Sequence, residues 1–136
     1  MGRHELREQV FKLLFRVEFN DPADMPEQVR LFVEDTENLT RKKDVDYVRD
    51  KYQHVQEKVG ELDRLINENT EGWDTARMGK VELTILRLAA YEILFDEDIP
   101  ASVAINEAVE IAKSYGQDTS GGFVNAILAK IAKLGD

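Results

Sequence analysis

The chain has no cysteine among its 136 residues, so disulfides, thiolate metal ligands and cysteine nucleophiles are all excluded. Its three prolines and eight glycines leave no room for a long disordered or fibrous segment. Nowhere do about 18 apolar residues run together, and charges interrupt the N-terminal sequence where a secretion signal would be apolar. These absences predict a soluble, cytoplasmic protein without membrane contact.

Histidine is nearly absent as well, with His4 and His54 the only two. They lie far apart in the sequence and form no HxxxH or HExxH pair, so neither a histidine metal site nor a nucleophile–base relay is predicted. Glu92 and Glu107 lie in apolar helical stretches, where partly buried hydrogen-bonding groups are a better interpretation than an acid–base pair. The sequence predicts no enzyme, no metal and no cofactor.

The net charge of −9 argues against a purely electrostatic nucleic-acid binder, because affinity for phosphates comes mostly from Lys and Arg. The charge is unevenly distributed, however. Residues 1–20 carry three carboxylates against four Lys and Arg, whereas residues 21–72 carry fourteen against eight and residues 73–136 carry ten against six. Any RNA site must therefore be small, local and assisted by a partner.

Apolar residues recur at helical spacing along most of the chain, and no segment shows the alternation of a strand. The pattern predicts an all-α fold of about six or seven helices. The 78–95 segment carries few charges and is predicted to be the central core helix. The predicted helices cover residues 3–19, a short stretch from Pro26, 44–69 as one long or two nearly collinear helices, 78–95, 102–115, and from Thr119 or Ser120 to about 134.

Two cations and two aromatic rings share one border of the first predicted helix. At 100° per residue, Arg3, Arg7, Phe11 and Phe15 follow one another along the edge of the apolar stripe. One interpretation is that the rings are ordinary core and the arginines are solvated. The other is that the arginines contact phosphate and the rings dock a partner.

The connector between the last two predicted helices, residues 112–123, is the second candidate site. It combines a lysine, two aromatic rings, small hydroxyl residues and a helix start, which suit stacked bases and phosphate. The alternative is a plain helix connector whose rings seal the core. Gly121-Gly122 is not a standard phosphate loop.

Four blocks of sequence after Trp73 resemble the NusB transcription antitermination family. In order they are LRLAAYE at 86–92, DIP at 98–100, VAINEAVEIAKSYG at 103–116 and FVN at 123–125. In the first helix, Arg7-Glu8 and Leu14-Phe15 also match, whereas residues 20–70 match only in helical pattern and length. The resemblance covers the C-terminal half almost continuously.

The resemblance implies a single domain, residues 1–136, built from two small helical subdomains packed together, about 1–70 and about 73–136. Members of this family bind the boxA element of ribosomal RNA operon leaders, usually together with the ribosomal protein that doubles as NusE. The pair helps to load other Nus factors onto RNA polymerase, which then reads through terminators. Both monomers and homodimers are compatible with the resemblance.

The resemblance also assigns roles to individual positions. Phe15 and Glu82 match positions that face the ribosomal-protein partner. The RNA-facing positions are Arg3, Arg7, Tyr115, Thr119, Ser120 and Phe123, with Lys113 and Arg87 as further candidates. The first hypothesis is thus an RNA-binding antitermination factor, and the alternative, favoured by the net charge, is an all-helical protein-interaction module without intrinsic RNA affinity.

Overall fold

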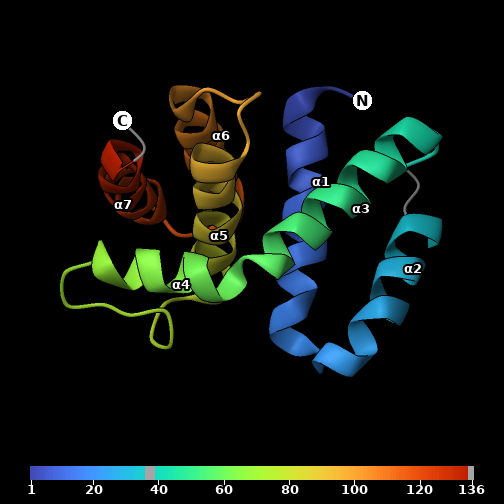
Figure 1. Ribbon diagram of the computed structural model, residues 1–136, viewed down its shortest axis with the longest axis horizontal. Helices are drawn as coiled ribbons and strands as arrows, with labels where there is room; N and C mark the ends of the chain where they lie inside the picture. Colours follow the sequence, from blue (N-terminus) through green and yellow to red (C-terminus); the bar gives the residue numbers. More distant parts are fainter. Residues whose placement is uncertain (36–38, 135–136) are drawn as a thin grey trace. The chain divides into compact units, whose positions relative to one another are not determined.

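The computed structural model describes residues 1–35 and 39–134, which fold into seven α-helices and two short 3₁₀ helices with no strand (Figure 1). This confirms the predicted all-α class. None of the helices in the described residues is long and apolar enough to cross a bilayer.

Contacts divide the chain into two compact units, Met1–Gln56 and Glu57–Asp136. The division precedes α4, Val59–Glu68, because that helix packs against α5, Lys80–Phe95, and α7, Ser120–Leu134. The connector near residues 70–73, which the sequence suggested as a boundary, thus lies inside the second unit. The packing of two subdomains on each other stays a prediction.

The first unit is built around three helices, which supply its buried apolar residues other than Leu39. Its first helix was expected to reach residue 19, but the last turn tightens into the 3₁₀ helix η1. The guanidinium of Arg16 lies 5.0 Å from the ring centroid of Phe32 and donates a hydrogen bond of 3.1 Å to Gln28. These contacts hold η1 against α2. The elements are α1 Arg3–Phe15, η1 Arg16–Phe19, η2 Pro22–Asp24, α2 Met25–Asp35 and α3 Lys42–Glu57.

The long apolar stripe at 44–69 belongs to two helices, α3 and α4. The helical hydrogen bonding changes at Lys58, whose φ of −106° and ψ of 5° depart from helical values. Gly60 lies within α4 and does not break it. The ammonium of Lys58 lies 4.9 Å from the ring centroid of Phe95, an attractive cation–π contact that favours this turn.

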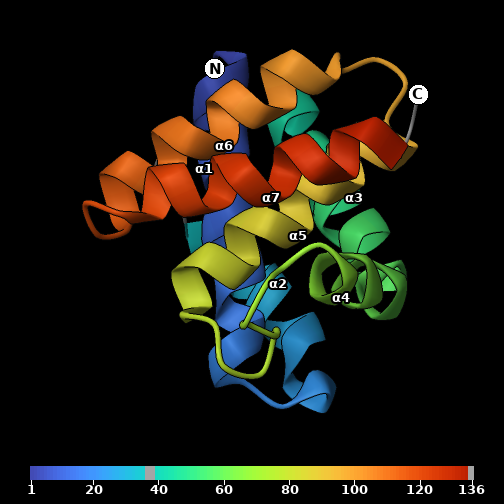
Figure 2. The same cartoon turned by 90° about the vertical axis from the view of Figure 1, so that its left-hand side faces the viewer.

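The second unit packs α5, α6 and α7 against one another and lays α4 on α5. Figures 1 and 2 both show α6 and α7 side by side. The predicted core helix is confirmed, because α5 buries residues on several sides. Those residues are Leu83, Thr84, Ile85, Leu86, Leu88, Ala89, Ala90 and Glu92. The helices are α5 Lys80–Phe95, α6 Ala101–Tyr115 and α7 Ser120–Leu134.

A paired ionic contact joins α4 to α5. The guanidinium of Arg87 donates two hydrogen bonds of 2.8 Å, one to each carboxylate oxygen of Asp63, and both side chains are half-buried. Bidentate pairs of this kind are stronger and more directional than single ion pairs. Arg87 was a candidate RNA contact, but the structure gives its guanidinium this partner within the protein.

We expect Asp63→Ala to lower the free energy of unfolding by about 1–2 kcal/mol, because it leaves the half-buried guanidinium without its bidentate acceptor. Urea denaturation followed by circular dichroism would measure the change. The control is Glu68→Ala, which removes the exposed pair with Arg64 at 3.2 Å and should cost less than about 0.5 kcal/mol. Equal losses in the two variants would contradict the structural role of Arg87.

Candidate functional site

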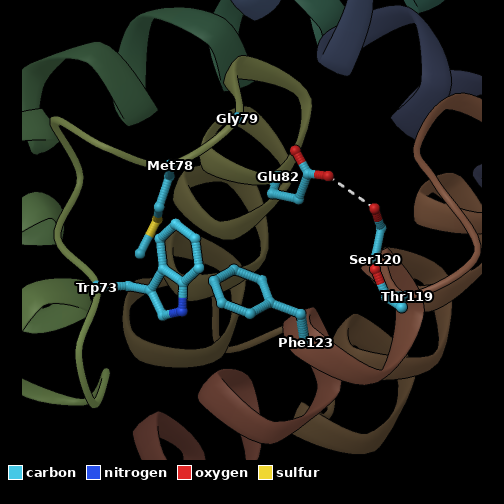
Figure 3. Close-up of a pocket in the computed structure, with 7 residues that line it drawn as sticks. All are labelled: Trp73, Met78, Gly79, Glu82, Thr119, Ser120 and Phe123. Carbon is cyan, nitrogen blue, oxygen red and sulfur yellow. Dashed lines mark hydrogen bonds between the residues drawn. The ribbon is translucent and has the colours of Figure 1, made fainter.

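A pocket of about 220 Å³ lies between the connector that precedes α5, the first turn of α5 and the first turn of α7 (Figure 3). Three predicted RNA-facing residues and the predicted partner-facing glutamate line it together. Sequence reasoning did not assign the other three lining residues to a site. The lining residues are Trp73, Met78, Gly79, Glu82, Thr119, Ser120 and Phe123.

Two aromatic rings form one wall of the pocket. Trp73 and Phe123 meet edge to face, with ring centroids 6.2 Å apart and planes at 80°. The Trp73 side of this pair remains open, since that residue is 53% exposed, and Met78 lines the same pocket (Figure 3). Exposed rings at the mouth of a pocket offer faces on which a planar group can stack.

Another wall of the pocket contains Glu82 and Ser120, which a short hydrogen bond joins. The hydroxyl of Ser120 donates to the Glu82 carboxylate at 2.6 Å and accepts from the Gln117 backbone N–H at 2.9 Å (Figure 3). Ser120 is buried and Glu82 is half-buried, so this link is partly shielded from water. The bond joins the start of α7 to the first turn of α5, and so sets the distance across the pocket.

Two glycines give this link its space. A Cβ on Gly116 would lie 2.6 Å from the Ser120 hydroxyl oxygen and 2.8 Å from the Ala112 carbonyl oxygen. One on Gly79 would lie 2.4 Å from a Glu82 carboxylate oxygen. Gly116 caps the C-terminal end of α6 with an extended backbone. Its lack of a side chain is required by close approach and not by a left-handed conformation.

The remaining candidates of the second unit lie at the end of α6. Tyr115 and Lys113 are both exposed, and the Lys113 ammonium is 3.5 Å from Glu110 on the same helix. The Phe123 ring, which lines the pocket, contacts Trp73.

The candidates of the first unit lie on α1. Arg3 is exposed at the start of the helix, whereas Arg7 is only 4% exposed. Phe15 is half-buried between two other rings, stacked on buried Phe11 at 5.9 Å and edge-on to Phe19 at 5.0 Å. The first helix thus presents one accessible predicted arginine, and its phenylalanines form a continuous aromatic row.

Comparison with known proteins identifies the family. A model of the NusB family matches residues 4–133. The transcription antitermination protein NusB of Agathobacter rectalis is 52% identical over 97% of this chain and 100% of its own length. That of Ruminiclostridium cellulolyticum is 44% identical over 98% of this chain and 90% of its own.

The chain belongs to the NusB family. Its fold agrees with solved NusB structures. NusB of T. maritima superposes with a TM-score of 0.85 at 39% identity, covering 98% of this chain and 92% of that one. A chain in the crystal structure of the antitermination factors NusB and NusE in complex with dsRNA gives a TM-score of 0.81 at 25% identity, covering 98% and 99%. The resemblance recognised in the sequence is confirmed.

Three pocket residues of this NusB-family chain were not predicted from the sequence. Trp73 comes from an irregular connector without helical periodicity. Met78 was predicted to begin the core helix but precedes α5, and the role of Gly79 rests on its close approach to Glu82. One signal could have pointed to Trp73, because it is the only tryptophan and stands beside Gly72 in a polar stretch. Loops carry a disproportionate share of binding residues, so a large ring in such a place is a candidate for one.

We expect Gly116→Ala to lower the free energy of unfolding by about 1–3 kcal/mol, since the added methyl group overpacks against a backbone carbonyl and a buried hydroxyl. Thermal denaturation would measure the loss. Gly122→Ala is the matched control, because no atom lies within 4 Å of its added Cβ. Inside α7 it should be neutral or slightly stabilising. A neutral Gly116→Ala variant would show that the close approach is not required.

Proposed function

We propose that this chain acts as a transcription antitermination factor. In this role it binds the boxA element of ribosomal RNA leader transcripts together with the ribosomal protein NusE. With other Nus factors it then promotes read-through by RNA polymerase. Support comes from family membership over residues 4–133 and from similarity to a NusB chain in a structure with NusE and dsRNA. Such a role would place the chain in the bacterial cytoplasm.

The observation that carries the RNA-binding proposal is the accessible pair of rings, Trp73 and Phe123, at the pocket mouth. Sequence-specific RNA recognition commonly stacks unpaired bases on aromatic side chains. Because the net charge is −9, phosphate attraction alone would be weak, and stacking supplies affinity that does not depend on net charge. Exposed Thr119 offers a hydroxyl beside the rings.

Cations play a smaller part in the proposed RNA contact than the rings do. The exposed cations Lys113 and Arg3 are proposed to contact RNA, and so is the exposed ring of Tyr115. Arg7 is buried and would need to be uncovered to reach phosphate. Arg87 is held by Asp63 and is left out of the proposed contacts.

The proposed NusE-facing residues are Phe15 and Glu82. Phe15 belongs to the aromatic row that ends at Phe19, which is 61% exposed. Aromatic side chains are enriched at protein interfaces, which supports this docking role. The Glu82 carboxylate accepts the hydrogen bond from Ser120 in the pocket wall. It would therefore have two roles, one in positioning Ser120 and one in contacting a basic partner.

We infer a binding role and not a catalytic one. His4 is paired with Glu8 at 2.8 Å on α1, His54 lies on α3, and neither lines the pocket. The pocket's most buried hydroxyl, that of Ser120, already makes two hydrogen bonds within the protein. The second candidate function is an all-helical interaction module without RNA affinity, and RNA-binding measurements distinguish the two.

We expect Trp73→Ala and Phe123→Ala each to weaken RNA binding at least about fivefold, because one stacked base contributes ~1–3 kcal/mol. Fluorescence anisotropy with a boxA-like single strand and a scrambled strand, with and without NusE, would measure it. Phe19→Ala, which removes an exposed ring that does not line this pocket, should leave RNA affinity measured without NusE unchanged.

Two results would contradict the proposed RNA contact. A large fall in melting temperature with unchanged affinity per folded molecule would make the rings structural. If the unaltered chain binds no RNA even with NusE present, the interaction-module function is the correct one.

A second prediction separates the two roles of Glu82. Glu82→Gln keeps an oxygen that can accept the Ser120 hydrogen bond and removes the charge. If the carboxylate meets a basic surface on NusE, the variant should bind NusE up to about fivefold more weakly, about 1 kcal/mol, with an unchanged melting temperature. Surface plasmon resonance would measure this. NusE binding that is normal in Glu82→Gln and impaired in Glu82→Ala would leave Glu82 with a positioning role only.

A further inference from the structure

A second pocket, of about 240 Å³, also has Trp73 and Phe123 among its lining residues. Because these two residues line both pockets, the two hollows adjoin at the aromatic pair. We name this second hollow the Lys130 pocket. Its lining residues are Asn69, Thr70, Glu71, Trp73, Phe123, Ala126, Ile127 and Lys130.

The walls of the Lys130 pocket suit a planar, largely apolar group. One side is the face of α7 made by Phe123, Ala126 and Ile127, and the other is the connector that follows α4. The connector is held by hydrogen bonds, including one of 2.8 Å from the Asn69 side-chain amide to the Leu65 carbonyl. The volume is below the ~300–1,000 Å³ of sites for drug-sized ligands, so it fits one base better than a larger ligand.

A lysine stands at the far end of the Lys130 pocket. Its ammonium is 4.0 Å from the carboxylate of Glu71, whose side chain is 94% exposed. An exposed pair at this distance contributes little, so an anion can replace Glu71 as the lysine's partner. Lys133, one turn further along α7, is also exposed and extends the positive charge in the same direction.

We propose that the Lys130 pocket is a second nucleotide subsite, which holds the base adjoining the one stacked at the first pocket while Lys130 contacts its phosphate. The proposal rests on the proposed RNA-binding function. From Phe123 to Lys130 the helix rises about 10 Å, at 1.5 Å per residue, which leaves space for one nucleotide beyond the rings. Rings followed by a cation along one groove are the combination with which proteins bind single strands.

Lys130→Gln in the full chain tests the proposal, with boxA-like RNA strands shortened one nucleotide at a time from either end. Anisotropy at several salt concentrations should show binding of the longest strand weakened about threefold. The slope of log affinity against log salt should fall by about 0.7, the value for one single-strand phosphate contact. Once the nucleotide at this subsite is removed, variant and unaltered chain should bind equally. The charge-matched control is Lys43→Gln, an exposed lysine on α3, which should change neither quantity.

Each alternative outcome is distinct. An unchanged slope and affinity in Lys130→Gln, with Phe123→Ala still impaired, would overturn the Lys130 subsite and leave the proposed function standing. A loss of NusE binding without a loss of RNA binding would assign the pocket to a protein contact and also overturn it. No RNA binding by the unaltered chain, with or without NusE, would overturn both the subsite and the proposed function.

Discussion

The hydrogen bond between Ser120 and Glu82 is the contact on which the candidate site depends. It joins the start of α7 to the first turn of α5. The Ser120 hydroxyl also accepts a hydrogen bond from the Gln117 backbone N–H, which holds the turn before α7. Phe123 lies one helical turn after Ser120, so the position of its ring relative to Trp73 follows from where this bond places α7. Two glycines leave the necessary space on either side. A single polar link between helices therefore positions the aromatic wall of the pocket.

Most of the helical architecture could be predicted from the sequence, because amphipathic periodicity is a local property. The segments 78–95 and 102–115 were predicted to within two residues of α5 and α6. The turn at Lys58 was not predictable in the same way, since apolar residues continue on both sides of it. Lys58 contacts Phe95, which lies 37 residues later in the chain and is brought close only by folding.

The site was predicted in part, and the missing part has a physical reason. Thr119, Ser120 and Phe123 share one connector, so their proximity needed no knowledge of the tertiary structure. The burial of Arg7 and the pairing of Arg87 with Asp63 arise from tertiary contacts. The sequence around an arginine does not show whether the folded chain will bury or pair it. Glu82 and Ser120 are 38 residues apart in the sequence, and they line the same pocket only because α5 and α7 meet in the folded chain.

The solitary tryptophan has a practical consequence. Trp73 is the only indole in the chain and stands, half-open to water, in the wall shared by two hollows. Indole emission responds to both solvent exposure and stacked aromatic neighbours. Intrinsic fluorescence of the unlabelled protein is thus a local optical reporter of occupancy in this region, and its signal is uncontaminated by any second tryptophan elsewhere in the fold.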